Sequence, residues 1–184
     1  MVSRKDMMSE DLFWELIDKT KGGDPQDQLD SLIAELSVRP IEDILGFDYR
    51  LDKYLENSYN PELWAAAYII CGGCTDDEFD IFRAWLISQG RDVYENALKD
   101  PDSLYEVCSK MGRNEYPENE EILYAALDSY EEATGKEDFY DVLDTFEDDF
   151  MMIEIELNWD EDDPKTLRNI CPKLFDLYYE NIGQ

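Results

Sequence analysis

The sequence predicts an all-α fold, a compact multi-helix bundle with one short extended segment near residues 151–159. Apolar residues recur every three or four positions through most of the chain, which is the spacing of one buried helix face. Helix punctuation bounds these stretches: an Asp or Asn followed by Pro at several starts, and Gly-Gly pairs at two ends. We expect a single helical domain over residues 9–184, in which an acidic C-terminal part, residues 109–184, packs on a core of residues 9–108.

The first three predicted helices are joined by short turns. Ser9 is the expected N-cap of the first helix, and Gly22-Gly23 ends it. Pro25 begins the second helix and Pro40 the third. Their apolar positions at helical spacing are Leu12, Phe13, Leu16 and Ile17, then Leu29, Leu32, Ile33 and Leu36, then Ile41, Ile44, Leu45, Phe47, Leu51, Tyr54 and Leu55.

Residues 60–92 are the most apolar and most strongly punctuated part of the chain, and they predict a two-helix hairpin. Pro61 begins a helix that is apolar nearly all round, so we expect it to be the central, most buried helix. Gly72 and its neighbour end that helix. Thr75 and Glu78 then form a capping box for the second helix of the hairpin.

Shorter elements follow Gly90. The expected helices are residues 94–98, the segment restarted by Asp100-Pro101, residues 120–134, the segment containing Phe139, Tyr140, Val142, Leu143, Phe146 and Phe150, and a last one begun by Pro164 and interrupted at Pro172. Between the last two, residues 151–159 alternate apolar with polar side chains, which is a strand signal. Since the sequence offers no partner strand, we expect an extended segment laid on the helices.

The charge of the chain limits its partners. It has 46 acidic and 16 basic residues, a formal net charge of −30 at pH 7. Direct binding to nucleic acid is disfavoured because phosphate contacts need a basic footprint, and an anionic membrane surface is excluded on the same ground. Three readings of the acidity remain: a basic protein partner, an acid-biased proteome, and a merely solvated surface.

Histidine is absent and cysteine is sparse. Without histidine there can be no His-based triad, HExxH zinc site or imidazole general base. Four cysteines without a secretory signal predict reduced thiols. No run approaches the roughly 20 apolar residues that span a bilayer, so we expect a cytoplasmic protein.

The Cys71-Gly-Gly-Cys74 motif invites a redox or zinc interpretation. Cys71 is expected at the C-terminal end of a helix, where the helix dipole disfavours a thiolate, and Cys74 faces an acidic stretch. A structural zinc site needs about four ligands, and Cys108 and Cys171 are isolated. We therefore expect two small residues beside a tight turn, with no metal ion and no cofactor.

Asp76, Asp77 and Arg83 are the candidate binding residues. The structural interpretation is that the two acids complement a helix N-terminus, and that Arg83 pairs with Asp80 at helical spacing. The functional interpretation is a metal-assisted enzyme that uses all three, which requires them to converge in one concave pocket. No catalytic residue is assigned.

A set of motifs runs through residues 9–104, with a weaker match near the C-terminus. They are Phe13-Trp14 with Leu16-Ile17, Leu63-Trp64-x-Ala66-Ala67, Gly72-Gly73, Asp76-Asp77-x-Phe79-x-x-Phe82-Arg83-x-Trp85-Leu86, Gly90-Arg91, Tyr94 with Ala97-Leu98, Pro101-Asp102-x-Leu104 and Pro172-Lys173-Leu174. In this combination the chain resembles the bacterial domain-of-unknown-function family numbered four-two-four-zero. The resemblance implies a small soluble helical bacterial domain and brings no activity. Residues 151–159 depart from the family pattern.

The leading hypothesis is a non-enzymatic interaction module whose acidic surface binds a basic protein, as an immunity-type or accessory protein would. Complementary charge speeds association and sets specificity. The metal-assisted enzyme is one alternative. A DNA-mimic inhibitor is another, although its acids should line one face at phosphate-like intervals and here they occur in every segment.

Overall fold

The computed structural model describes residues 3–112, 115–150 and 153–179, and within them it contains helices and no strand, which confirms the all-α prediction. The α-helices are α1 (Glu10–Thr20), α2 (Pro25–Leu36), α3 (Ile41–Asn57), α4 (Pro61–Cys71), α5 (Asp76–Ser88), α6 (Arg91–Lys99), α7 (Tyr105–Cys108), α8 (Ala125–Thr134), α9 (Phe139–Leu143), α10 (Pro164–Ile170) and α11 (Pro172–Tyr179). The 3-10 helices are η1 (Arg4–Asp6), η2 (Pro101–Leu104) and η3 (Glu121–Tyr124).

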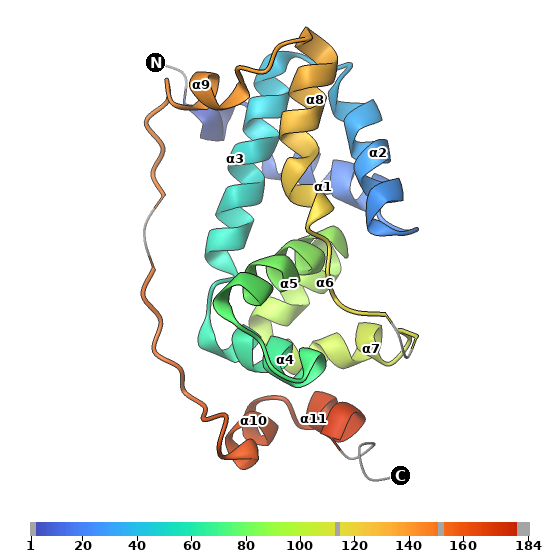
Figure 1. The fold of residues 1–184 in the computed structure, drawn as a ribbon, viewed down its shortest axis with the longest axis vertical. Helices are drawn as coiled ribbons and strands as arrows, with labels where there is room; N and C mark the ends of the chain where they lie inside the picture. The colour runs from blue at the N-terminus through green and yellow to red at the C-terminus, as the bar shows by residue number, and fades with distance from the viewer. Residues whose placement is uncertain (1–2, 113–114, 151–152, 180–184) are drawn as a thin grey trace.

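The helices form two groups that share one core. In the view of Figure 1, α1, α2, α3 and α8 lie above α4 to α7, and α10 and α11 lie below. Helix α8 packs on α2 and α3, while α10 and α11 pack on α4. Aromatic rings fill the centre; the centroids of Phe13 and Phe47, for example, lie 4.9 Å apart. Full burial of each such ring stabilises the fold by about 1.5–3 kcal/mol.

The helix starts follow local sequence chemistry. The Ser9 hydroxyl accepts the Leu12 N–H at 3.1 Å, and the Asn60 side chain accepts the Leu63 N–H at 2.9 Å. Thr75 and Glu78 form the predicted reciprocal capping box at the start of α5. Each such cap satisfies an amide that has no partner inside the helix, and is worth about 1 kcal/mol.

Helix α4 is largely enclosed, with Glu62 as its one exposed residue, and α5 is enclosed from Phe82 onward. Every α5 residue from Phe82 to Ser88 is buried, because α1, α3, α4 and α6 all contact this helix. Helix α4 has one face that stays half-buried. Trp64 and Tyr68 lie on this face, four residues apart.

The predicted helix containing Phe146 and Phe150 is wrong beyond Leu143, where α9 ends. The chain then leaves helical geometry, and Asp148 and Asp149 form hydrogen bonds with η1 and α3 instead.

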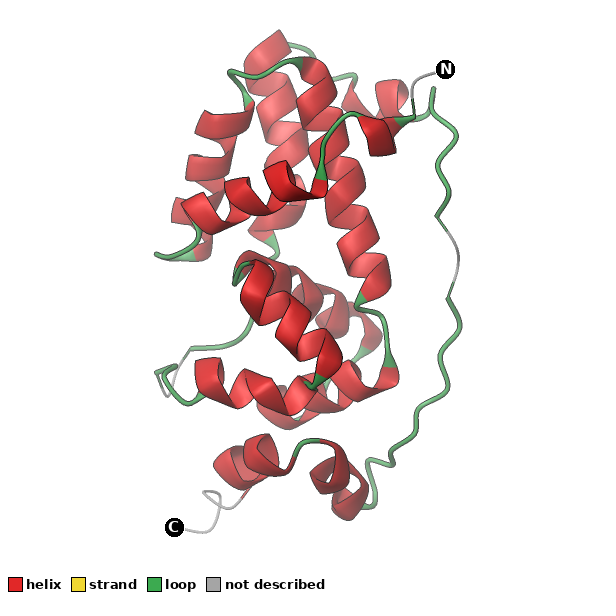
Figure 2. Ribbon diagram, turned by 180° about the vertical axis from the view of Figure 1, so that it is seen from behind, coloured by secondary structure: helices red, strands yellow, loops and turns green. Residues whose placement is uncertain are grey.

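The chain between α9 and α10 runs along the outside of the molecule as an extended strap (Figures 1 and 2). Residues 151–152 lie outside the described residues. Residues 153–157 are extended but belong to no sheet, and Asp160 and Asp163 form an isolated bridge beyond them. None of the helices in the described part of the chain combines the length and apolar character that a bilayer crossing requires.

Candidate functional site

The acidic strap, defined here as residues 147–163, concentrates charge of one sign. It contains nine acidic residues and no Lys or Arg. All of the acids except Asp148 are exposed. They are Glu147, Asp148, Asp149, Glu154, Glu156, Asp160, Glu161, Asp162 and Asp163.

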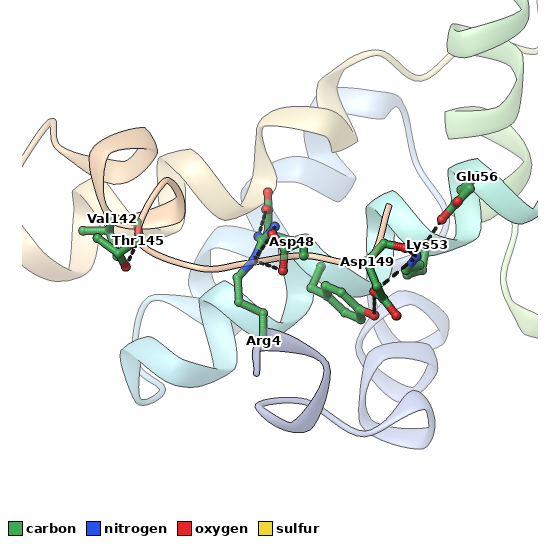
Figure 3. Close-up of polar contacts among 9 residues, drawn as sticks. Arg4, Asp48, Lys53, Glu56, Val142, Thr145 and Asp149 are labelled. Carbon is green, nitrogen blue, oxygen red and sulfur yellow. Dashed lines mark hydrogen bonds and ion pairs between the residues drawn. The ribbon is translucent and has the colours of Figure 1, made fainter. Parts of the chain in front are cut away.

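An arginine from the start of the chain holds the first end of the strap (Figure 3). Only 4% of the Arg4 side chain is exposed, and it pairs with Asp48 of α3 and with Asp148 of the strap. Its Nε atom donates to Asp148 Oδ2 at 3.0 Å. Two carboxylates on one buried guanidinium give charge-assisted hydrogen bonds, which are about twice as strong as neutral ones.

Helix α3 supplies two more contacts to this first anchor. The Tyr49 hydroxyl donates to Asp149 Oδ1 at 2.7 Å, and Lys53 Nζ donates to the Asp149 backbone carbonyl at 2.8 Å. Burial of Tyr49, together with this hydrogen bond, raises the pKa of its hydroxyl to about 12. The Lys53 ammonium also lies 4.5 Å from the centre of the Phe150 ring. The strap is therefore fixed by η1 and α3 over three consecutive residues, Asp148 to Phe150.

A further carboxyl group lies beside this anchor without a cationic partner of its own among the recorded ion pairs. Burial, and then the negative charge of Asp48 one turn away, raise the pKa of Asp52 to about 7. Burial also raises the pKa of Asp48, although its pairing with Arg4 opposes this. The anchor thus contains a carboxyl that changes charge near neutral pH.

The second end of the strap is fixed to the start of α4. The Asn158 amide donates to Glu62 Oε1 at 2.7 Å, and the Trp159 indole Nε1 donates to the Pro61 carbonyl at 2.8 Å. Trp159 is 9% exposed, although most of the strap around it is not buried. The strap is consequently held at both ends.

The middle of the strap has no such contacts. In the described part of the chain, residues 153–157 form no hydrogen bond or ion pair. Ile153 is 38% and Leu157 47% exposed, and both acids between them, Glu154 and Glu156, are exposed as well. The middle therefore offers carboxylates, apolar side chains and free backbone groups to solvent.

Two of the three residues predicted as a binding site share a pocket. Arg83 is 7% exposed. It pairs with Asp80 and donates to the Leu55 carbonyl. Asp76 accepts a hydrogen bond from the Tyr59 hydroxyl at 2.9 Å.

This pocket has a volume of about 330 Å³, and Glu56, Tyr59, Asp76, Asp80, Arg83, Phe150 and Ile153 line it. Asp77 is exposed and is not part of this lining. The structure therefore brings Asp76 and Arg83 together and leaves Asp77 apart. The motif that marked Asp76 and Arg83 gave no sign that Phe150 and Ile153 of the strap complete the pocket wall.

Within the described residues, the cysteines are neither paired with one another nor grouped with carboxylates as a metal site. All four thiols are free. Burial raises the pKa of both Cys71 and Cys74 to about 12, so these thiols are protonated at neutral pH. Among the described residues, no group of three or more acidic or cysteine side chains is arranged to hold a metal ion.

A larger hollow, about 800 Å³, lies beside α2, α5 and the loop before η3. Its buried polar groups satisfy one another. The Gln28 amide donates to the Ser88 carbonyl at 3.3 Å and accepts from Asn119 at 3.0 Å, while Asn119 caps the Ile122 N–H at 3.1 Å. This network accounts for its buried polar residues, Gln28, Ser88 and Asn119, as structural support.

One comparison with known proteins gives a match. Residues 8–132 match the model of a family described as "Protein of unknown function (DUF4240)". The match extends from the residue before Ser9 to most of α8, so the strap and α9 to α11 lie beyond it. No curated protein and no solved structure is significantly similar to the chain.

Proposed function

The chain belongs to the DUF4240 family, and we propose that it is a non-enzymatic interaction module that binds a basic protein through its acidic strap. An immunity-type protein that neutralises a basic toxin, or an accessory protein, would act in this way. The proposal rests on one observation above all. The strap contains nine acidic residues and no Lys or Arg, is anchored at both ends, and is exposed between them.

The physical argument has two parts. A chain of net charge −30 attracts a basic partner over a distance and repels other acidic proteins. Charge alone gives little lasting affinity at the rim of an interface. The exposed Ile153 and Leu157 supply apolar area among the carboxylates of the strap, and anchoring reduces the entropy lost when a partner orders this segment.

The test compares two variants of equal charge. The first neutralises the strap through Glu147→Gln, Glu154→Gln, Glu156→Gln and Asp162→Asn. The matched control neutralises four exposed acids on helices through Glu15→Gln, Glu106→Gln, Glu131→Gln and Asp92→Asn. Each immobilised full-length chain is incubated with cytoplasmic extract of the native organism, and bound proteins are identified by mass spectrometry.

We expect the native chain and the control to retain a basic protein that about 0.5 M salt releases, because salt at this concentration screens charges beyond a few ångströms. The strap variant should lose that protein. Equal retention by both variants, retention that resists salt, or no retained basic protein would contradict the proposal.

A small-ligand site at Asp76 and Arg83, as a metal-assisted enzyme would need, is a second candidate. It is favoured by the pocket that these two residues share. It predicts that Asp76→Asn weakens Mn²⁺ binding in calorimetry, whereas Asp77→Asn, the same change outside the pocket, does not. Equal behaviour of the two variants would remove this candidate.

A further inference from the structure

A second pocket lies where the strap returns to α4. Its volume is about 350 Å³, and its lining residues are Trp64, Tyr68, Cys74, Leu157, Trp159, Asp160 and Glu161. Trp64 and Tyr68 come from the half-buried face of α4. Trp159 comes from the strap, and its ring centroid lies 5.1 Å from that of Tyr68. We call this the aromatic pocket.

The polar atoms of the three rings are already engaged. Trp64 Nε1 donates to the Cys74 carbonyl at 3.0 Å, Trp159 Nε1 to the Pro61 carbonyl at 2.8 Å, and the Tyr68 hydroxyl to Glu161 Oε2 at 3.3 Å. The pocket therefore presents ring surfaces and two carboxylates, without a ring N–H or O–H to bind an anion. Ring faces and carboxylates together attract cations.

Two other aromatic rings that lie near acids in this chain carry cations of their own. The Arg83 guanidinium lies 4.8 Å from the centre of the Tyr59 ring, and the Lys53 ammonium lies over Phe150. Among the described residues, by contrast, no Lys or Arg lies over a ring of the aromatic pocket, and no salt bridge reaches its two acids. The aromatic pocket has the lining of a cation site but no internal cation.

We propose that the aromatic pocket binds the ammonium group of a lysine side chain from the basic partner, an inference that rests on the proposed function. Its volume is at the lower end of the roughly 300–1,000 Å³ range of ligand pockets, which suits one side chain. Leu157, 47% exposed at the rim, provides apolar surface for the lysine stem.

The carboxylates favour lysine over arginine. Glu161 already accepts the Tyr68 hydroxyl, and Asp160 Oδ1 accepts the Asp162 N–H at 2.9 Å. Each carboxylate thus has one oxygen engaged, which works against the paired hydrogen bonds that a guanidinium forms with both oxygens. The lysine ammonium is a compact charge and does not need two hydrogen bonds to the same carboxylate.

The test uses the full chain and two probes, N-acetyl-lysine methylamide and the corresponding arginine compound. Binding is followed by NMR of the four indole N–H groups. Trp64 and Trp159 report on the pocket, while Trp14 and Trp85, which are buried, serve as internal references. We expect the lysine probe to shift the first pair selectively and to bind more tightly than the arginine probe.

One matched pair of charge variants and one ring variant test the lining. Glu161→Gln should weaken lysine binding, whereas Asp162→Asn, an equal charge change outside the lining, should not. Tyr68→Leu should weaken it by about 2- to 5-fold, the loss expected for one exposed cation–π contact. Equal shifts of all four indoles, equal effects of the two charge variants, or tighter arginine binding would overturn the proposal.

The two experiments distinguish failure of the lysine-site proposal from failure of the proposed function. If the chain retains a salt-released basic protein but the lysine probe leaves Trp64 and Trp159 unshifted, the aromatic pocket is not a lysine site and the interaction function stands. If the probe binds selectively and no basic protein is retained, the pocket binds ammonium groups but its assignment to a protein partner is wrong.

Discussion

Replacing Asp52 by Asn is expected to stabilise the protein above pH 7. Asp52 lies on α3 beside the first anchor of the strap, where Asp48, Arg4, Asp148 and Glu56 all act on its carboxyl. Burial is the largest cause of its raised pKa, and three of those four neighbours carry negative charge. Asparagine keeps the shape of the side chain and removes the charge that this environment disfavours.

The pKa shift gives both the sign and an upper limit of the effect. In the unfolded chain the carboxyl ionises near 3.8, and in the folded chain near 7. Between these values the folded state holds a proton that the unfolded state has lost, so the free energy of unfolding falls as pH rises through this window. A shift of this size is worth about 4 kcal/mol at most. Because Asp52 is only half-buried and its neighbours can rearrange, we expect about 1–2 kcal/mol.

The assay is urea unfolding followed by circular dichroism at pH 5 and pH 8. The Asp52→Asn variant should be more stable than the native chain at pH 8 by about 1–2 kcal/mol, with a smaller difference at pH 5. Glu15→Gln, which removes an exposed charge on α1, separates this effect from general charge repulsion. The reasoning is refuted if Asp52→Asn is destabilising at pH 8, or if it changes the pH dependence no more than the control does.

Three other substitutions, with Gly112→Ala as a control for one of them, test the contacts that hold the fold. Arg4→Gln leaves two partly buried carboxylates unpaired and should lower the free energy of unfolding by about 3 kcal/mol. Limited proteolysis should then cut within the strap first, and a loss below about 0.5 kcal/mol would contradict the role of this anchor. Asn60→Ala removes the α4 N-cap and should cost about 1 kcal/mol in thermal unfolding, with unchanged stability as the opposing result. Gly46→Ala would place a Cβ 2.6 Å from the Met8 backbone nitrogen and should lower the free energy of unfolding by at least 1–3 kcal/mol. Gly112→Ala would place its Cβ 3.4 Å from a flexible side chain and should be nearly neutral in the same thermal unfolding experiments.

The parts of the fold that can be predicted from the sequence are those that depend on interactions between residues only a few positions apart. Asn60 begins α4 and Thr75 begins α5, because a cap needs only a side chain and an amide three positions later. The extended segment was likewise visible as an alternation of apolar and polar residues. These signals act locally, so the rest of the molecule does not alter them.

The helix prediction was wrong where contacts between residues far apart in the sequence determine the structure. Phe146 and Phe150 have helical spacing, but Asp148 and Asp149 between them bind Arg4 and Tyr49, which lie about a hundred residues or more away. The local pattern contains no trace of those partners, so the predicted helix was too long.

The candidate site shows the same limit. The motif that contains Asp76 and Arg83 placed both on α5, and the structure finds them in one pocket. A helix that is apolar nearly all round, as predicted from Pro61 onward, does not indicate which of its faces the strap would meet. The aromatic pocket is completed by Trp159, and only the path of the strap brings that ring to α4.

The pairing of Arg4 with Asp148 joins residues 144 positions apart, and this separation bears on the order of folding. Closing a loop costs entropy that rises with its length, and contacts between distant residues slow folding. During synthesis at about 5–20 residues per second, α1 to α8 leave the ribosome before Asp148 does. The helices α1 to α8 can therefore pack while the N-terminal arginine still lacks its second carboxylate, and the strap, with α10 and α11 behind it, joins them afterwards.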